Sequence, residues 1–386
     1  MNPGRRWGSP WALVRAAPAP QNCVLDSGAH MKIFVFGSSI VSAYWNGAAT
    51  YYRGVFRALH GLGHEIHFCE PDIFDRQANR DLETDPDYVK VRVYRDDAEL
   101  EALQAEAADA DLVVKCSGVG ARDRELEEWL AGMSGPLRAF WDVDAAHTLE
   151  RIEGDDADPM RRWIPRYDLI FTYGGGPPVV RRYRALGARA CHPIYNGLDP
   201  DVHTPVPPDP SFACDVVFLG NRLPDREERV DRFFMAAAER LPDHRFILGG
   251  SGWDGKRLPP NVRWIGHVPT VLHNVLNCSA RFVLNIHRAA MARNGYSPAT
   301  RLFEAAGAGA CQITDAWVGI EEFFEPGKEL LVAHDGEDVV RWVREVDDDT
   351  ARTIGRAARA RALRDHSYDG RARQVDEVLR TAAARS

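Results

Sequence analysis

Short apolar runs alternate with amphipathic segments along the first half of the chain. The runs cover residues 33–36, 65–69, 112–115, 139–143 and 169–173. Continuous apolar runs of this length are typical of parallel strands that are buried on both faces of a sheet. Helical patterns lie between them, at residues 50–62, 98–108 and 177–186. This order of strand, helix and strand predicts a doubly wound α/β domain.

The alternation pauses at a proline-rich segment and then starts again. Residues 193–212 contain six prolines, which is typical of a linker. Further apolar runs follow at 215–219, 245–248, 262–265, 281–286 and 310–314. We therefore predict two Rossmann-like domains that face each other across a cleft, where ligands of such folds bind. The predicted parts are a first domain at 31–200, a linker at 201–213, a second domain at 214–365 and a C-terminal helix at 366–386.

Residues 1–30 do not continue this pattern. Their apolar patch at 11–14 is interrupted by Arg15, so it is too short for the core of a signal peptide. A strand pattern begins directly at Met31. We interpret residues 1–30 as a disordered leader or as the product of an upstream start.

Composition and charge limit the possible partners. Forty-eight Lys and Arg against 56 Asp and Glu give a net charge of -8, which argues against a surface that gathers nucleic acid. The chain has no stretch of about 18 apolar residues, so we expect no transmembrane segment and at most peripheral membrane contact. The seven cysteines show no metal-binding spacing and are typical of reduced thiols. These features favour a cytoplasmic protein with no nucleic acid partner and no bound metal.

The most informative segment is residues 285–315. Ser297 and Pro298 are typical of a helix start, and Ser297, Arg301 and Glu304 then share one helical face. A helix N-terminus beside an arginine suits a pyrophosphate. A glutamate two turns along can accept hydrogen bonds from a ribose diol. The alternative is that Arg301 and Glu304 form a surface ion pair of about 0.2 to 0.5 kcal/mol.

This segment resembles a known family. The stretch GYSPATRLFEAAGAG, followed by ITDAWVGIEEFFEPGKELLVAHD, resembles the donor-binding half of GT-B glycosyltransferases. It is most similar to the group that includes the spore maturation protein CgeB, and the likeness extends over residues 31 to about 340. The resemblance implies that Glu304 holds a nucleotide ribose and that Arg301, with the Ser297 helix start, faces a diphosphate. It also places His287 and Tyr296 beside the donor. The chain departs from the group by having Gly307-Ala308-Gly309 where cysteine is usual.

A second donor-side loop follows the first strand of the second domain, in FLGNRLPDREERV. The resemblance implies that this loop supplies a cation to the leaving phosphate, which makes Arg222 a catalytic candidate and Arg226 a donor-binding candidate. The alternative is that both are solvated charges beside Asp225 and Glu227. We expect the backbone of Gly220 to approach the donor closely.

Three residues of the first domain are further candidates. Asn46 and Gly47 lie between the first strand and the next helix, where a glycine lets backbone amides approach a sugar or diphosphate. A tight turn is the alternative. Lys115 ends an apolar strand and needs an anionic partner, so we expect it to project into the cleft. Asn46 and Lys115 are assigned to the acceptor side, and Gly47 to the donor.

The stretch Asp142-Val143-Asp144 superficially matches the DxD metal motif of the other large glycosyltransferase fold. We set that reading aside because the flanking pattern is that of GT-B. Alternate strand positions face one side, so both carboxylates are expected to face the cleft. Asp144 or His147 is then a candidate base for the acceptor hydroxyl, and Asp142 an acceptor-side residue. The alternative is that Asp144 caps the following helix.

Together these features predict a hexosyltransferase-type enzyme of class EC 2.4. It would move a sugar from a nucleotide diphosphate sugar to a hydroxyl of a carbohydrate, small-molecule or protein acceptor, with no cofactor and no metal. The resemblance favours retention at the anomeric carbon. A nucleotide-sugar epimerase and a non-catalytic binding protein remain alternatives. A dehydrogenase is disfavoured because no GxGxxG follows Phe36.

Overall fold

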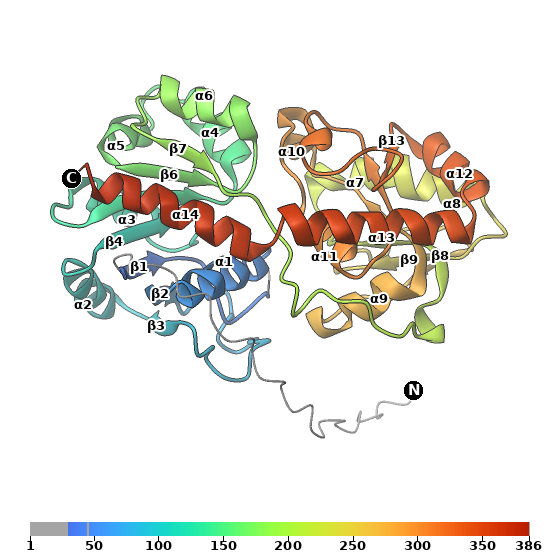
Figure 1. Cartoon of the computed structure of the whole chain (residues 1–386), viewed down its shortest axis with the longest axis horizontal. Coiled ribbons are helices and arrows are strands. Elements are labelled where there is room, and N and C mark those ends of the chain that lie inside the picture. The colour runs from blue at the N-terminus through green and yellow to red at the C-terminus, as the bar shows by residue number, and fades with distance from the viewer. Residues whose placement is uncertain (1–29, 45, 386) are drawn as a thin grey trace.

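The computed structural model describes residues 30–44 and 46–385, which form two α/β domains (Figure 1). The first contains a sheet of seven parallel strands in the order β3-β2-β1-β4-β5-β6-β7. Its strands are β1 Lys32–Phe36, β2 Glu65–Pro71, β3 Lys90–Tyr94, β4 Leu112–Cys116, β5 Leu137–Asp142, β6 Leu169–Thr172 and β7 Cys191–Pro193. Its helices are α1 Ala49–Gly61, α2 Asp97–Ala107, α3 Asp123–Gly132, α4 Ala145–Gly154, α5 Met160–Trp163 and α6 Gly176–Ala185.

Burial on both faces of this sheet explains its continuous apolar runs. In β1, Ile33 and Val35 belong to one buried cluster, whereas Phe34 and Phe36 belong to another on the opposite face. The strand lies centrally, because Phe34 pairs with His67 of β2 on one side and with Val113 of β4 on the other. A central strand with two covered faces favours apolar side chains at every position.

The second domain repeats this arrangement with six parallel strands in the order β10-β9-β8-β11-β12-β13. They are β8 Cys214–Leu219, β9 Phe246–Gly249, β10 Val262–Trp264, β11 Ala280–Asn285, β12 Gln312–Asp315 and β13 Leu331–Ala333. The helices of this part of the chain are α7 Pro224–Val230, α8 Ala236–Arg240, α9 His273–Ser279, α10 Ala289–Asn294, α11 Thr300–Gly307, α12 Gly336–Glu345 and α13 Asp348–Asp365. The last helix, α14 Tyr368–Ala383, returns to the first domain. A π-helical turn, Asp231–Met235, joins α7 to α8.

The chain crosses between the domains twice, and the two crossings are hydrogen-bonded to each other. The N–H of Leu198, on the way to the second domain, donates to the carbonyl of His366 at 2.7 Å. On the way back, the N–H of Tyr368 donates to the carbonyl of Leu198 at 2.9 Å. Helix α14 then lies along the first domain while α13 lies along the second (Figure 1). Buried side chains of α14, such as Val375 and Leu379, complete the core of the first domain.

The predicted fold class is confirmed, since both sheets are doubly wound and parallel. Strands β3, β7 and β13 were not predicted. The first has the polar pattern KVRVY of an edge strand, and the other two have three residues each. The leader predicted at residues 1–30 lies outside the described residues, except for His30.

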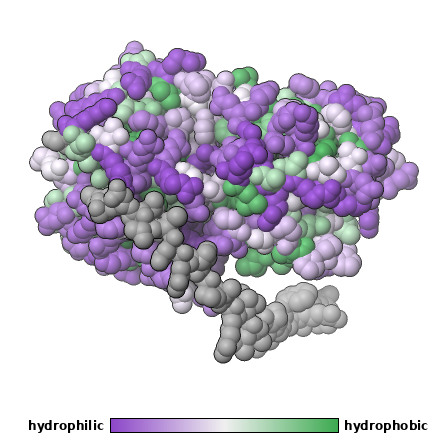
Figure 2. Space-filling model, viewed as in Figure 1, coloured by the Kyte–Doolittle hydropathy of each residue, from purple (hydrophilic) through white to green (hydrophobic). Residues whose placement is uncertain are grey.

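The face crossed by α13 and α14 is mainly hydrophilic, with apolar residues in separate patches (Figure 2). Within residues 30–44 and 46–385, no helix combines the length and the apolar character needed to cross a membrane.

Candidate active site

A cavity of about 590 Å³ lies between the two domains. Its walls are built from loops that follow the carboxyl ends of strands in both sheets, which is where doubly wound folds bind ligands. Predicted site residues that line it are Asn46, Gly47, Asp144, Gly220, Arg226, His287, Arg301 and Glu304. Lys115, Asp142, His147, Arg222, Tyr296 and Ser297 do not line it.

Helix α11 begins at the cavity, but not through the predicted cap. The cap position is Ala299, and the hydroxyl of Ser297 donates to the carbonyl of Gly295 at 2.8 Å. The prediction that Ser297 caps the helix is therefore wrong, because the helix starts two residues later than expected. In place of a side-chain cap, the Nε2 atom of His287 accepts from the N–H of Ala299 at 3.2 Å. The N–H groups of the first turn of α11 thus open toward the cavity wall.

A buried carboxylate sets the tautomer of His287. Asp315 lies 2.7 Å from Nδ1 of His287 and also accepts from its backbone N–H at 3.2 Å. Burial raises the pKa of Asp315, but His287 and Arg229 outweigh it and hold the pKa below its usual range. An ionised Asp315 keeps the imidazole proton on Nδ1, which leaves Nε2 as the acceptor for the helix. His287 therefore lines the cavity as the residue that fixes the start of α11.

Two arginines of the cavity wall have no acidic partner. Within the described part of the chain, neither Arg226 nor Arg301 forms a salt bridge, and the Nε of Arg226 is buried without a hydrogen bond. Arg301 lies over the ring of Phe218, at 5.5 Å. Burial and the charge of Arg226 lower the pKa of Arg301 to about 10, and burial and Arg288 lower the pKa of Arg226. Two neighbouring cations that repel each other in a cavity form a site for an anion.

Glu304 lies on the same wall and is 9% exposed. His203 Nε2 is 4.0 Å from its Oε1, and His273 Nδ1 is 3.8 Å from its Oε2. Burial raises the pKa of Glu304, but the neighbouring His273, together with the charges of His203 and Arg301, outweighs it and lowers the pKa to about 2. The carboxylate is thus ionised at neutral pH and can accept hydrogen bonds from a diol.

Arg288 joins the two domains at the edge of the cavity. Its Nε donates to Asp225 at 2.7 Å in the second domain, and its Nη1 lies 3.5 Å from Asp144 in the first. Asp144 occupies the cap position of α4, although its side chain does not cap the helix. His147 points away on the exposed side of α4. Of the two predicted base candidates, the structure brings Asp144 to the cavity.

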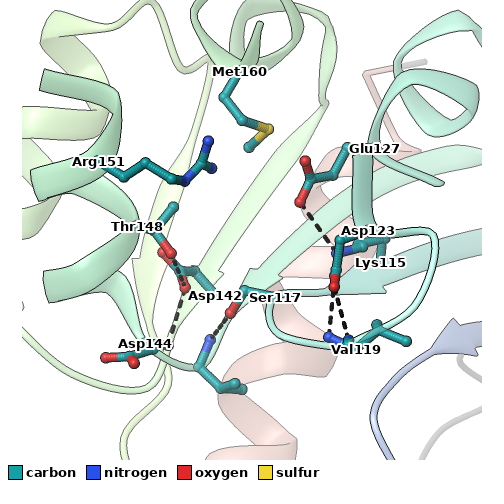
Figure 3. Close-up of polar contacts among 12 residues, drawn as sticks. Lys115, Ser117, Val119, Asp123, Glu127, Asp142, Asp144, Thr148, Arg151 and Met160 are labelled. Atoms are coloured by element: carbon teal, nitrogen blue, oxygen red, sulfur yellow. Dashed lines mark hydrogen bonds and ion pairs between the residues drawn. The ribbon is translucent and has the colours of Figure 1, made fainter. Parts of the chain in front are cut away.

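Asp142 and Asp144 do not face the same side (Figure 3). Strand β5 ends at Asp142, so the alternation that should align the two carboxylates stops there. Asp142 is fully buried and accepts hydrogen bonds from the hydroxyl of Thr148 and the N–H of Asp144, each at 3.0 Å. The predicted common orientation is wrong, and Asp142 instead fixes the turn that positions Asp144.

Lys115 does not project into the cleft, which corrects the prediction. Its side chain is fully buried under α3, where Nζ pairs with Asp123 and lies 3.2 Å from Glu127 (Figure 3). Asp123 also accepts from the N–H groups of Val119 at 3.1 Å and Gly120 at 2.7 Å. The expected anionic partner exists, but it comes from the next helix. Lys115 therefore supports the loop after β4, whose residues Ser117 and Gly118 line the cavity.

Arg222 and Tyr296 have partners outside the cavity. Arg222 forms a two-pronged pair with Glu227, at 2.8 and 2.7 Å. This geometry matches the alternative of a paired surface charge. Tyr296 has a φ of 45° and joins the domains through its backbone, since its carbonyl accepts from the N–H of Gly175 at 2.7 Å.

Several residues around the cavity were missed by the sequence analysis. They are Arg76, His203, His273, Arg288 and Asp315. Each lies in a loop or at an element end, and its partner is distant in the sequence. The position of Asp315 at the end of a predicted strand was the one available signal.

Comparisons with known proteins agree with this architecture. Residues 226–377 match the family model described as Glycosyl transferase-like. No curated protein matches the chain.

Solved structures with the same fold cover nearly the whole chain. The HepE protein of Anabaena in complex with UDP-glucose is 14% identical, covering 91% of this chain and 100% of its own, with a TM-score of 0.63. Sucrose-phosphate synthase of Thermosynechococcus elongatus is 15% identical, with a TM-score of 0.69. The match covers 92% of this chain and 100% of the synthase chain. An alpha-glucosyltransferase in complex with UDP and a DNA 13-mer containing an HMU base is 12% identical, with a TM-score of 0.65. The match covers 92% of this chain and 100% of the glucosyltransferase chain. The chain therefore has the GT-B fold, and residues 226–377 carry the sequence pattern of the glycosyl transferase-like family.

Proposed function

We propose that the protein is a glycosyltransferase that uses a nucleotide diphosphate sugar as donor. One observation carries the proposal, namely the pair of cavity-lining arginines, Arg226 and Arg301, that lack an acidic partner among the described residues. A diphosphate supplies negative charge that can pair with both guanidinium groups. Glu304, one turn along α11 from Arg301, is then the residue that holds the ribose hydroxyls.

The same groups suit the chemistry of transfer. The bond between the anomeric carbon and a phosphate oxygen breaks, and the acceptor oxygen forms the new bond to that carbon. Negative charge grows on the departing nucleoside diphosphate, where Arg226, Arg301 and the first turn of α11 stabilise it. These groups are positioned before the reaction, so little reorganisation is needed in the transition state.

Other features of the reaction stay predictions. We propose retention at the anomeric carbon, with the acceptor proton moving to a phosphate oxygen of the leaving group, and a mechanism that needs neither metal nor cofactor. Placement in the CgeB-like group, transfer of a hexosyl unit and a cytoplasmic location rest on the sequence alone. We propose a carbohydrate, small-molecule or protein acceptor, whereas one solved relative by fold was crystallised with DNA.

Binding of nucleoside diphosphates tests the proposal. At a concentration of 100 times the dissociation constant, a ligand of the folded state adds about 2.7 kcal/mol to the free energy of unfolding. We expect at least one of UDP, GDP, dTDP and CDP to raise the melting temperature. Failure of all four at millimolar concentration would contradict the donor site. Incubation of the matching nucleotide sugars with candidate acceptors, followed by mass spectrometry, then detects transfer.

A Glu304→Gln variant separates ribose recognition from diphosphate recognition. The amide keeps the size of the side chain but loses the charged acceptor, so affinity for the preferred nucleoside diphosphate should fall roughly 10-fold. Affinity for inorganic pyrophosphate, which has no ribose, should not fall. Isothermal titration calorimetry measures both ligands, with Glu321→Gln as a control on an exposed position. An equal loss for both ligands would argue against the ribose assignment.

A further inference from the structure

Arg76 is a buried cation on the first-domain wall of the cavity. It lies in the loop that follows β2, and it is 6% exposed. The sequence around it carries no motif. Arginine is seldom this buried unless an acidic group pairs with it. Its surroundings are therefore informative about what binds there.

The guanidinium is fixed in place without being neutralised. Its Nη1 donates to the carbonyls of Ser38 at 3.1 Å and Val119 at 3.3 Å, and the group stacks 5.2 Å from the ring centre of Phe74. Its Nε is buried without a hydrogen bond. Asp123, which also pairs with Lys115, holds the N–H of Val119 (Figure 3). Within the described residues Arg76 takes part in no salt bridge.

The nearby carboxylate of Glu70 does not pair with Arg76, because other groups hold it. Glu70 is fully buried and accepts hydrogen bonds from Ser39 Oγ at 2.9 Å, the N–H of Ile40 at 2.7 Å and Gln77 Nε2 at 2.6 Å. Burial raises the pKa of Glu70, and these three hydrogen bonds oppose that shift. The carboxylate is thus held by Ser39, Ile40 and Gln77, and it forms no salt bridge with Arg76. Burial also lowers the pKa of Arg76, and the charge of Glu70 opposes this shift without cancelling it.

The backbone before Arg76 is strained. Phe74 and Asp75 have φ values of 56° and 55°, a left-handed conformation that residues other than glycine seldom adopt. Such strain of about 1–3 kcal/mol per residue is typical of segments that present a functional group. The phenyl ring of Phe74 is 58% exposed while it stacks on the guanidinium. The loop thus holds an apolar ring and a charged group together beside the cavity.

We propose that Arg76 binds an anionic group of the acceptor, so that the acceptor is a phosphate ester or a carboxylate. This inference rests on the proposed function. The donor diphosphate already has Arg226, Arg301 and the start of α11 on the second-domain wall. Arg76 belongs to the first-domain wall, where the acceptor enters in this arrangement. A phosphate or carboxylate suits the guanidinium because both accept paired hydrogen bonds.

Ligand-observed NMR on the full-length protein tests the proposal. UDP, or whichever nucleoside diphosphate binds best, is first added to saturation, and this step reports on the donor site separately. Methyl phosphate and acetate are then titrated, with methanol as the neutral probe. We expect one of the anions to bind and methanol not to bind. The two anions distinguish a phosphate ester from a carboxylate. If no nucleoside diphosphate binds, the anions and methanol are titrated into the ligand-free protein. Their affinities are then compared between the wild type and the variants described next.

Three variants separate charge from scaffold. Arg76→Gln should weaken anion binding roughly 10-fold, and Arg76→Lys, which keeps the charge, should recover part of it. A purely structural role predicts that the two variants behave alike. Arg80→Gln is the matched control, since Arg80 pairs with Asp85 in the same loop and does not line the cavity. The proposal is overturned if neither anion binds the wild type, or if Arg76→Gln binds as well as the wild type.

Donor binding supplies a final comparison. If Arg76→Gln weakens binding of UDP-glucuronate while UDP and UDP-glucose bind normally, the anion belongs to the donor sugar and the acceptor assignment fails. Unchanged binding of all three supports the acceptor assignment.

Discussion

An Arg301→Met variant should bind nucleoside diphosphate about 100-fold more weakly than the wild type, because it loses a charge-assisted contact in a partly buried site. At the same time, its ligand-free form should unfold at a higher temperature. Arg301 forms no salt bridge among the described residues, and burial together with Arg226 outweighs the charge of Glu304 and lowers its pKa to about 10. Below that pH the folded protein carries a cation that its surroundings disfavour. Methionine fills similar space without the charge, so we expect a gain of about 1 kcal/mol in the free energy of unfolding.

Calorimetry with UDP and thermal unfolding without ligand measure the two effects. Arg222→Met is the matched control, since Arg222 lies in the loop just before α7, the helix that carries Arg226, but pairs with Glu227 outside the cavity. It should leave the affinity unchanged and should not raise the stability. A variant at Arg301 that keeps wild-type affinity would remove the main support for the donor site. Loss of both affinity and stability would indicate a structural role instead.

The fold was predictable because burial acts on every residue of a central strand. Strand β1 shows this well, since alternate residues of Ile33–Phe36 enter two different cores and all must be apolar. Edge strands are constrained on fewer sides. In β3, Lys90 and Arg92 face solvent or ion pairs, so the apolar pattern fades and the strand was missed.

The site was predictable where a single helix carries several of its residues. The spacing of Arg301 and Glu304 predicted that they share one face of α11, and in the structure both line the cavity. Arg76 is different, because its significance depends on its forming no salt bridge within residues 30–44 and 46–385, which is a fact about the folded structure. The spacing of residues along the sequence does not show which charged groups pair in the folded structure. Lys115 does have the anionic partner that its burial requires, but the sequence alone could not show that α3 provides it.

A Lys115→Met variant should lose about 3–5 kcal/mol of the free energy of unfolding, because breaking a buried ion pair leaves uncompensated charge. The charge left behind is that of Asp123 and Glu127. Burial already raises the pKa of Glu127, with Lys115 opposing the shift, and removal of Lys115 should raise it further. The folded variant would then bind more protons than the unfolded chain above the ordinary pKa of a glutamate. Its stability should therefore fall as the pH rises, and the defect should be larger at pH 8 than at pH 5.

Chemical denaturation at the two pH values measures this defect. Adding Glu127→Gln to Lys115→Met should restore part of the stability and reduce the pH dependence, because the buried charge is then removed. Lys90→Met is the matched control: Lys90 pairs with Glu65 on the surface and is 62% exposed, so it should change stability by less than about 1 kcal/mol. A Lys115→Met variant with wild-type stability at both pH values would contradict the ion-pair account. If the account holds, the variant should also weaken anion binding at Arg76, because Asp123 fixes the loop whose Val119 carbonyl holds that guanidinium.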